Sequence, residues 1–185
     1  ASNGYFIAQV HLAEMYYEGC GVVQNYNEAY RWHYMAAEQD FTGSQIMLGN
    51  MFRNGYGVEQ SYTEAVKWYR KAAEQGDSTG QLMVGMSYYL GQGVIQNKLE
   101  SVKWFRLSAD QGNAGAQSVL GMLYEDGVAV DKNLGEAYFW HLIAAANGDE
   151  DSLEKRDNLA KKLTPKQISD IQARATKWFS DHQKD

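Results

Sequence analysis

The chain repeats itself every 36 residues, and this period restricts the fold more than any other feature of the sequence. Columns of glutamine, glycine, glutamate and tryptophan each recur four times at that spacing, beginning at Gln9, Gly19, Glu28 and Trp32. Self-similarity at a fixed period of this length is typical of tandem repeat proteins, in which each unit packs on its neighbours. We therefore interpret the chain as a tandem array.

Each unit has the pattern of two helices. In the first helix an aliphatic residue stands four positions before an aromatic one, as Leu48 does before Phe52, which places both on one face. A Gly-x-Gly segment such as 55–57 then predicts the helix end, because glycine readily takes the left-handed conformation of a C-terminal cap. In the fourth unit Ala129 replaces the second glycine, and we expect a variant turn there.

Capping residues mark where the helices begin. Four residues stand three positions before the repeated glutamates and predict the start of each second helix: Asn25, Ser61, Asn97 and Asn133. Asp77, Asn113 and Asp149 follow the turns between units and are expected to cap the next helix. Each second helix carries a tryptophan and a pair of small residues, which we interpret as core.

The two ends of the chain depart from the repeat. Residues 1–4 are in phase with the end of an earlier unit, so we expect them to be the tail of an upstream repeat. Residues 149–163 predict a charged helix, and 164–167 a capping box for a last helix. That helix has an apolar stripe made of Ile168, Ile171, Ala175, Trp178 and Phe179. A divergent terminal pair of this kind closes the exposed core of a solenoid.

These patterns predict an all-α fold, an α–α superhelix (solenoid) of about four 36-residue helix-turn-helix repeats plus a C-terminal capping helix pair. The tandem array is expected over residues 1–148, with units at 5–40, 41–76, 77–112 and 113–148. The capping helices are expected over 149–185.

Composition argues against several classes of partner. A net charge of −6 without a basic cluster predicts no nucleic-acid binding. No stretch approaches the roughly 20 apolar residues of a membrane helix, so we expect no membrane span. Cys20 is the single cysteine and has no internal partner for a disulfide.

No pattern of catalytic or ligand-binding residues stands out. His33 and His141 share the repeat column of Tyr69 and Phe105, which indicates a packing or edge position and not a pair of metal ligands. The Gly-x-Gly segments follow helices, whereas a dinucleotide loop follows a strand. The acidic run at 149–151 lacks the glycine and final glutamate of a calcium loop. We therefore predict no catalytic residue, no metal and no cofactor.

The motif A-x-Q-x-x-L-G-x-x-Y-x-x-G-x-G-V, followed by E-A-x-x-W-x-x-x-A-A, resembles the Sel-1-like repeat family, which is related to tetratricopeptide repeats. It is clearest at residues 80–88 and 64–73. The resemblance implies a non-catalytic α-solenoid that serves as a scaffold or adaptor, usually in bacteria. Cysteine-rich members have been linked to β-lactam binding, but this chain lacks their cysteines. The compartment stays open between periplasm, secretion and cytoplasm.

In tetratricopeptide-like solenoids the first helices line the concave face, and equivalence to that fold implies a partner-binding groove here. Its candidate residues vary from unit to unit: Glu14, Tyr17, Asn50, Arg53, Met86, Tyr89, Leu90, Met122 and Glu125. Such a groove predicts a protein or peptide partner, with the acidic residues favouring basic partner segments. The competing surface is the turn rim, with Tyr26, Tyr56 and Tyr62. The alternative function is an enzyme or small-molecule binder that acts on cell-wall-type substrates.

Overall fold

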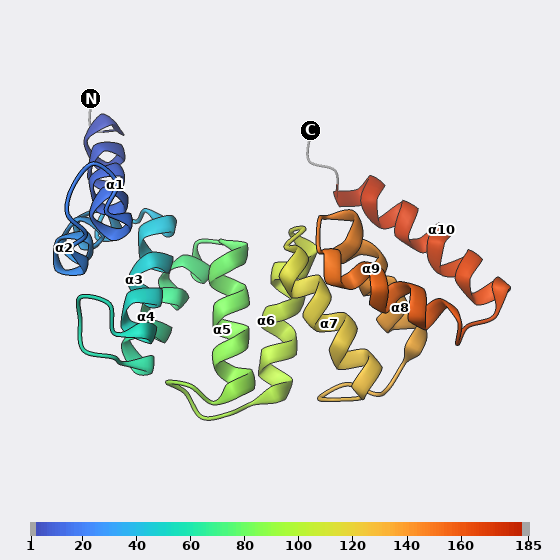
Figure 1. Cartoon of the computed structure of the whole chain (residues 1–185). Coiled ribbons are helices and arrows are strands. Elements are labelled where there is room, and N and C mark those ends of the chain that lie inside the picture. The colour runs from blue at the N-terminus through green and yellow to red at the C-terminus, as the bar shows by residue number, and fades with distance from the viewer. Residues whose placement is uncertain (1–2, 183–185) are drawn as a thin grey trace. The chain divides into compact units, whose positions relative to one another are not determined.

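The computed structural model describes residues 3–182, and the regular elements in that range are α-helices (Figure 1). They are α1 (Asn3–Glu18), α2 (Tyr26–Ala37), α3 (Thr42–Asn54), α4 (Tyr62–Glu74), α5 (Ser78–Leu90), α6 (Lys98–Asp110), α7 (Ala114–Asp126), α8 (Leu134–Ala146), α9 (Glu150–Ala160) and α10 (Pro165–His182). The all-α prediction is confirmed for these residues. Of the expected upstream tail, residues 1–2 lie outside the described residues, and α1 already includes residues 3–4.

The helices form two compact units, Ala1–Gln96 with α1–α5 and Asn97–Asp185 with α6–α10. In the first unit each helix packs against the next one along the chain. In the second unit α7 packs against α6 and α8, and α8 also contacts α9 and α10. Packing between neighbours in sequence is the arrangement expected of helical repeats.

Side-chain caps begin the helices at the positions that the sequence predicts. Seven residues accept hydrogen bonds from backbone N–H groups of the first helical turn: Asn25, Ser61, Asp77, Asn97, Asn113, Asn133 and Asp149. Thr164 and Gln167 exchange hydrogen bonds reciprocally at the start of α10, as a capping box does. The repeated glutamates use their carboxylates in ion pairs, for example Glu64 with Lys67 at 2.6 Å.

Left-handed residues end the first helices, as the Gly-x-Gly segments predict. Gly55 is one such cap, with a φ of 74°. The expectation of a variant turn at Ala129 is wrong, because its φ of 62° lies close to the 72° of Gly57 and the 74° of Gly93. At Gly57 and Gly93 a side chain is excluded for a further reason. A Cβ there would collide with the backbone carbonyl oxygen of Tyr26 or Tyr62, so these turns press directly on the preceding repeat.

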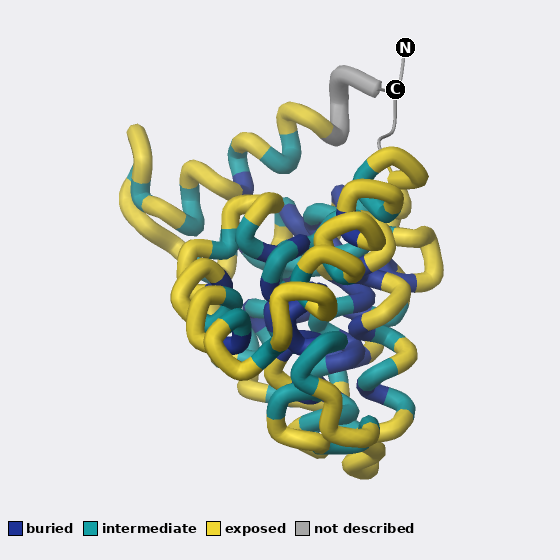
Figure 2. Tube along the Cα trace, turned by 90° about the vertical axis from the view of Figure 1, so that its right-hand side faces the viewer, coloured by how far each residue is buried: buried dark blue, intermediate teal, exposed yellow. Residues whose placement is uncertain are grey.

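A buried column of large side chains in the second helices follows the tryptophan by one residue. Its four members are at most 1% exposed: His33, Tyr69, Phe105 and His141. This confirms the packing interpretation of the two histidines. The tryptophans themselves are buried at Trp68 and Trp140 but only half-buried at Trp32 and Trp104. Figure 2 shows that the buried residues lie on the inner sides of the helices, and the connecting turns are largely exposed.

The apolar stripe of α10 is confirmed as the packing face of that helix. Ala175 is buried, and the other stripe residues are half-buried. Ile168 and Ile171 join a cluster around Tyr138 of α8 and Leu159 of α9. The α10 helix therefore closes the end of the second unit.

Candidate interaction surface

The nine candidate residues all lie on first helices of the repeats and are at least partly exposed. By contrast, the aliphatic positions two residues earlier are fully buried at Leu48, Val84 and Leu120. Seven candidates belong to the first unit, and Met122 and Glu125 to the second. The helical register that the sequence indicates thus separates core positions from accessible ones on α3, α5 and α7.

Asn50 is tied to the core beneath it. The hydroxyl of the buried Tyr69 donates a hydrogen bond to Asn50 Oδ1 at 2.8 Å. Burial raises the pKa of Tyr69 to about 12, so this hydroxyl keeps its proton at physiological pH. The side chain of Asn50 therefore orients toward its own repeat.

Tyr17 belongs to a cluster of three rings that we call the tyrosine cluster: Tyr17, Tyr26 and Tyr56. Tyr17 meets the other two rings edge-on at centroid distances of 5.3 and 6.2 Å, and Tyr26 stacks on Tyr56 at 4.8 Å. Burial, followed by the two neighbouring tyrosines, raises the pKa of Tyr17. The sequence had assigned Tyr17 to the groove and the other two to the turn rim. In the structure the three rings are in contact. Tyr17 therefore belongs to both the expected groove and the turn rim.

A repeated glutamine, which the sequence interpretation missed, holds the ends of the first helices. The side-chain amides of Gln24, Gln60 and Gln96 donate to the backbone carbonyls of Tyr17, Arg53 and Tyr89, at 2.8–2.9 Å. The 36-residue spacing of these glutamines was the available signal. Because each bond ends at a candidate position, the glutamines fix the backbone from which those side chains project.

The candidates on α5 and α7 differ in their surroundings. Leu90 is 49% exposed, while Met86 and Tyr89 are half-buried beside it on α5. On α7, Met122 is exposed, whereas the Glu125 carboxylate lies 3.4 Å from Nζ of Lys162. Leu90 is therefore the most exposed of the three apolar candidates on α5, and Glu125 already has a cationic neighbour.

The structure also assembles a serine, a histidine and an aspartate that sequence analysis did not connect. His141 Nδ1 lies 2.9 Å from Ser152 Oγ, whose backbone N–H donates to the carboxylate of Asp149 at 3.0 Å. His141 and Ser152 are fully buried, and burial lowers the pKa of His141 to about 4. A nucleophilic serine needs access to substrate and an effective base. These contacts therefore serve packing and helix capping.

The described surface is hollowed in several places, three of which lie away from the candidate residues. One of 510 Å³ lies on α2, and two of 450 and 300 Å³ lie in the second unit. None of the nine candidate residues lines any of these three cavities. Within residues 3–182, no group of three or more His, Cys, Asp or Glu side chains is placed to hold a metal ion. Nor does any helix of that range have the length and apolar character needed to cross a membrane.

Helix pairs with repeated caps and one recurrent core column define a helical repeat protein. The Sel1 repeat model matches four consecutive segments, residues 7–41, 42–77, 78–113 and 114–149. The chain therefore belongs to the Sel1 repeat family, as its motif implied. Sel1 repeats generally mediate protein–protein interaction.

Solved structures support the same assignment. A protective antigen of uropathogenic Escherichia coli strains with an SLR fold is 34% identical over 86% of this chain, with a TM-score of 0.80. This chain spans only 34% of that antigen. A Sel1 repeat protein from Oxalobacter formigenes is 31% identical over 93% of this chain and 73% of its own length, with a TM-score of 0.79. Cysteine rich protein B of Helicobacter pylori is 26% identical over 64% of this chain and 92% of its own, with a TM-score of 0.54. No curated protein matches the chain.

Proposed function

We propose that the protein is a non-catalytic scaffold that binds a segment of a partner protein along the first helices of its first unit. We call this surface the first-helix face: Glu14, Tyr17, Asn50, Arg53, Met86, Tyr89 and Leu90. One observation carries the proposal. On α3 and α5 the same register positions stay accessible beside buried aliphatic residues, yet their side chains change from polar to apolar. Packing within the repeat therefore does not require one particular side chain at these positions, and this variation supports a role in recognising a partner.

The α5 part of the face supplies the anchors. Methionine and tyrosine are enriched at protein interfaces, and large side chains near the centre of an interface carry most of its binding energy. Met86, Tyr89 and Leu90 offer such side chains within five residues of one helix. Glu14 on α1 is exposed and acidic, which favours a partner segment with basic residues.

A peptide library displayed on phage and selected against the full chain provides the test, with affinities of selected peptides measured by calorimetry. Tyr89→Ala is expected to weaken binding by about 2 kcal/mol, the cost of truncating a hot spot. Tyr62→Ala is the matched control, because Tyr62 is 37% exposed on the turn rim of the same unit. Tyr17 is unsuitable for this purpose, since its ring also contacts the rim tyrosines. Wild-type affinity for Tyr89→Ala, together with lost binding for Tyr62→Ala, would move the site to the rim.

Met122 and Glu125 occupy the same register on α7, and we propose them as a contact of the second unit. Met122→Ala tests this contact by itself. A selected peptide that loses affinity through Met122→Ala alone would place the main contact on α7 and overturn the choice of the first unit.

The alternative, an enzyme or binder of cell-wall-type substrates, has no accessible reactive group to support it in the Ser152, His141 and Asp149 cluster. Hydrolysis of a chromogenic lactam by the wild-type chain, abolished by Ser152→Ala, would contradict the non-catalytic proposal.

A further inference from the structure

Two histidines are sealed at contacts between successive repeats. We use the word seam for the contact between the second helix of one repeat and the first helix that follows it. In the α2–α3 seam, Nδ1 of His33 lies 3.1 Å from Oγ of Ser44. In the α8–α9 seam, Nδ1 of His141 lies 2.9 Å from Oγ of Ser152. All four side chains are essentially excluded from solvent.

The other ring nitrogen of each histidine, Nε2, lies where neither solvent nor a polar group would stabilise a positive charge. Nε2 of His33 and of His141 is buried and has no hydrogen-bond partner among the described residues. At His141 the ring lies against Gly121, where an added Cβ would come within 2.6 Å of Nε2. A proton on Nε2 of His141 would therefore place a charged N–H group against the α7 backbone, at a position that solvent does not reach. Burying a donor or charge in this way is costly.

The charged groups around the two rings do not compensate for burial. Glu14 of α1 favours a proton on His33, but burial outweighs it and lowers the pKa to about 4. Around His141, burial and then Lys155 lower the pKa, while Glu125 and Asp149 raise it, and the result is again about 4. Both rings are thus neutral in the closed seams at physiological pH.

In the other two seams the same buried position holds a ring that does not take up a proton in acid. Tyr69 of α4 and Phe105 of α6 stand in the histidine column. Gly80 and Ala116 stand where the histidine seams have serine. The histidines therefore always occur with serine, and the tyrosine and phenylalanine with a small residue. This pairing separates two seams whose ring can take up a proton in mild acid from two whose ring cannot.

We propose that mild acid opens the two histidine seams, separating α2 from α3 and α8 from α9, while the α4–α5 and α6–α7 seams stay closed. A free histidine has a pKa near 6.5 and takes up its proton before the buried one does. Protonation therefore favours the open state. The stabilisation is complete above about pH 6.5 and is lost as the pH falls toward 4.

Hydrogen exchange measured by mass spectrometry at pH 7.5 and pH 5.0, corrected for intrinsic rates, tests the proposal. From pKa values of 6.5 and about 4, protection in α2 and α9 is expected to fall roughly 30-fold. Peptides from α4–α5 and α6–α7 are internal controls and are expected to change far less. An equal loss in all four seams would overturn the proposal.

Variants that copy the insensitive seams sharpen the test. Phe105 and Ala116 provide the pattern for His141→Phe with Ser152→Ala, and Gly121 already leaves room for the ring. This double variant is expected to lose the extra acid sensitivity of α9 but keep that of α2. If it does not fold, titration of the histidine ring signals of the wild type by NMR decides the question. A buried histidine that titrates near 6.5 in the folded chain would contradict the proposal.

Discussion

The α4 and α8 helices have the same repeat pattern, but the outer face of α4 is charged and exposed whereas that of α8 is apolar and buried. On α4 the outward positions hold Lys67 and Lys71, whose side chains are 64% and 49% exposed. On α8 the same positions hold Phe139 and Ile143, which are buried. Two changes from lysine to apolar residues thus turn a solvated helix face into a packing surface.

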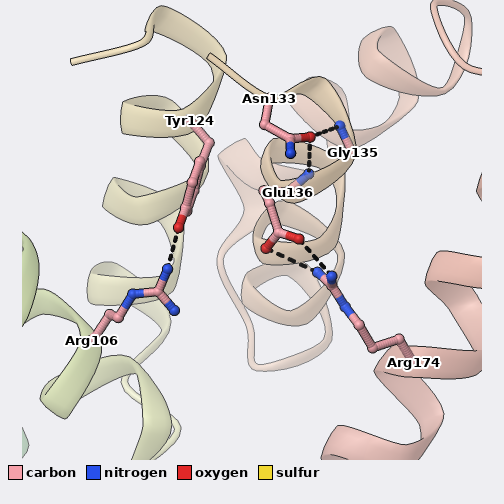
Figure 3. Close-up of polar contacts among 6 residues, drawn as sticks. All are labelled: Arg106, Tyr124, Asn133, Gly135, Glu136 and Arg174. Carbon is pink, nitrogen blue, oxygen red and sulfur yellow. Dashed lines mark hydrogen bonds and ion pairs between the residues drawn. The ribbon is translucent and has the colours of Figure 1, made fainter. Parts of the chain in front are cut away.

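The helix that covers this surface is α10. Arg174 of α10 pairs with both carboxylate oxygens of Glu136, at 2.5 and 3.1 Å (Figure 3). The guanidinium of Arg174 lies 3.7 Å from the ring centroid of Phe139. On α4 the equivalent glutamate, Glu64, pairs instead with Lys67 of its own helix. The same carboxylate therefore serves a local ion pair inside the array and a tertiary contact at its end.

The largest expected effect is common to both helices. Trp68→Ala and Trp140→Ala each remove a buried indole and are expected to cost about 3–5 kcal/mol of unfolding free energy. Urea denaturation followed by circular dichroism measures this cost. A loss below about 1 kcal/mol at Trp68 would show that the tryptophan column is not core in α4. Trp104→Ala, at a half-buried position, is the matched comparison and should cost less.

The second effect separates the two outer faces. Phe139→Ala is expected to cost about 3 kcal/mol, because the ring is buried beneath α10. Lys67→Ala at the equivalent position of α4 is expected to stay within about 0.5 kcal/mol. The same denaturation experiment compares the two. Equal effects would mean that α10 does not cover α8 in solution.

The smallest effect concerns Arg174. Arg174→Met keeps the aliphatic stem and removes the charge, so only the ion pair and the cation–π contact are lost. We expect a loss of about 1 kcal/mol, since the side chain is 45% exposed and solvent screens the pair. Repeating the measurement in 1 M salt should shrink the difference between wild type and variant. If salt leaves this difference unchanged, the stability loss of the variant comes from packing and not from the ion pair.

Local chemistry explains why much of the fold could be predicted from the sequence. A cap such as Asn25 bonds N–H groups two and three residues away, so its effect is readable from neighbouring positions. The docking of α10 on Phe139 joins residues far apart in the chain, and the sequence indicated a stripe on α10 without its partner. The signal was nevertheless present, because Phe139 interrupts a column of Arg31, Lys67 and Lys103.

The candidate face was predictable only in part. Repeat register placed its residues on accessible sides of the first helices. It did not show that the turn carrying Tyr56 packs back against the start of α2, which brings that ring onto Tyr26 and Tyr17. Nor did it show that Ala129, between the caps of α7 and α8, keeps the turn geometry of glycine.

The contact of Gly57 and Gly93 with the carbonyls of Tyr26 and Tyr62 bears on how such a chain lengthens during evolution. Both partners in this contact are backbone, so it does not depend on side-chain identity at the receiving position. A duplicated unit of 36 residues would bring its own glycine and its own carbonyl, and would fit without compensating substitutions. An insertion of one residue in the turn would displace the glycine from its carbonyl. Growth by whole units therefore preserves this contact, whereas growth by single residues in the turn breaks it.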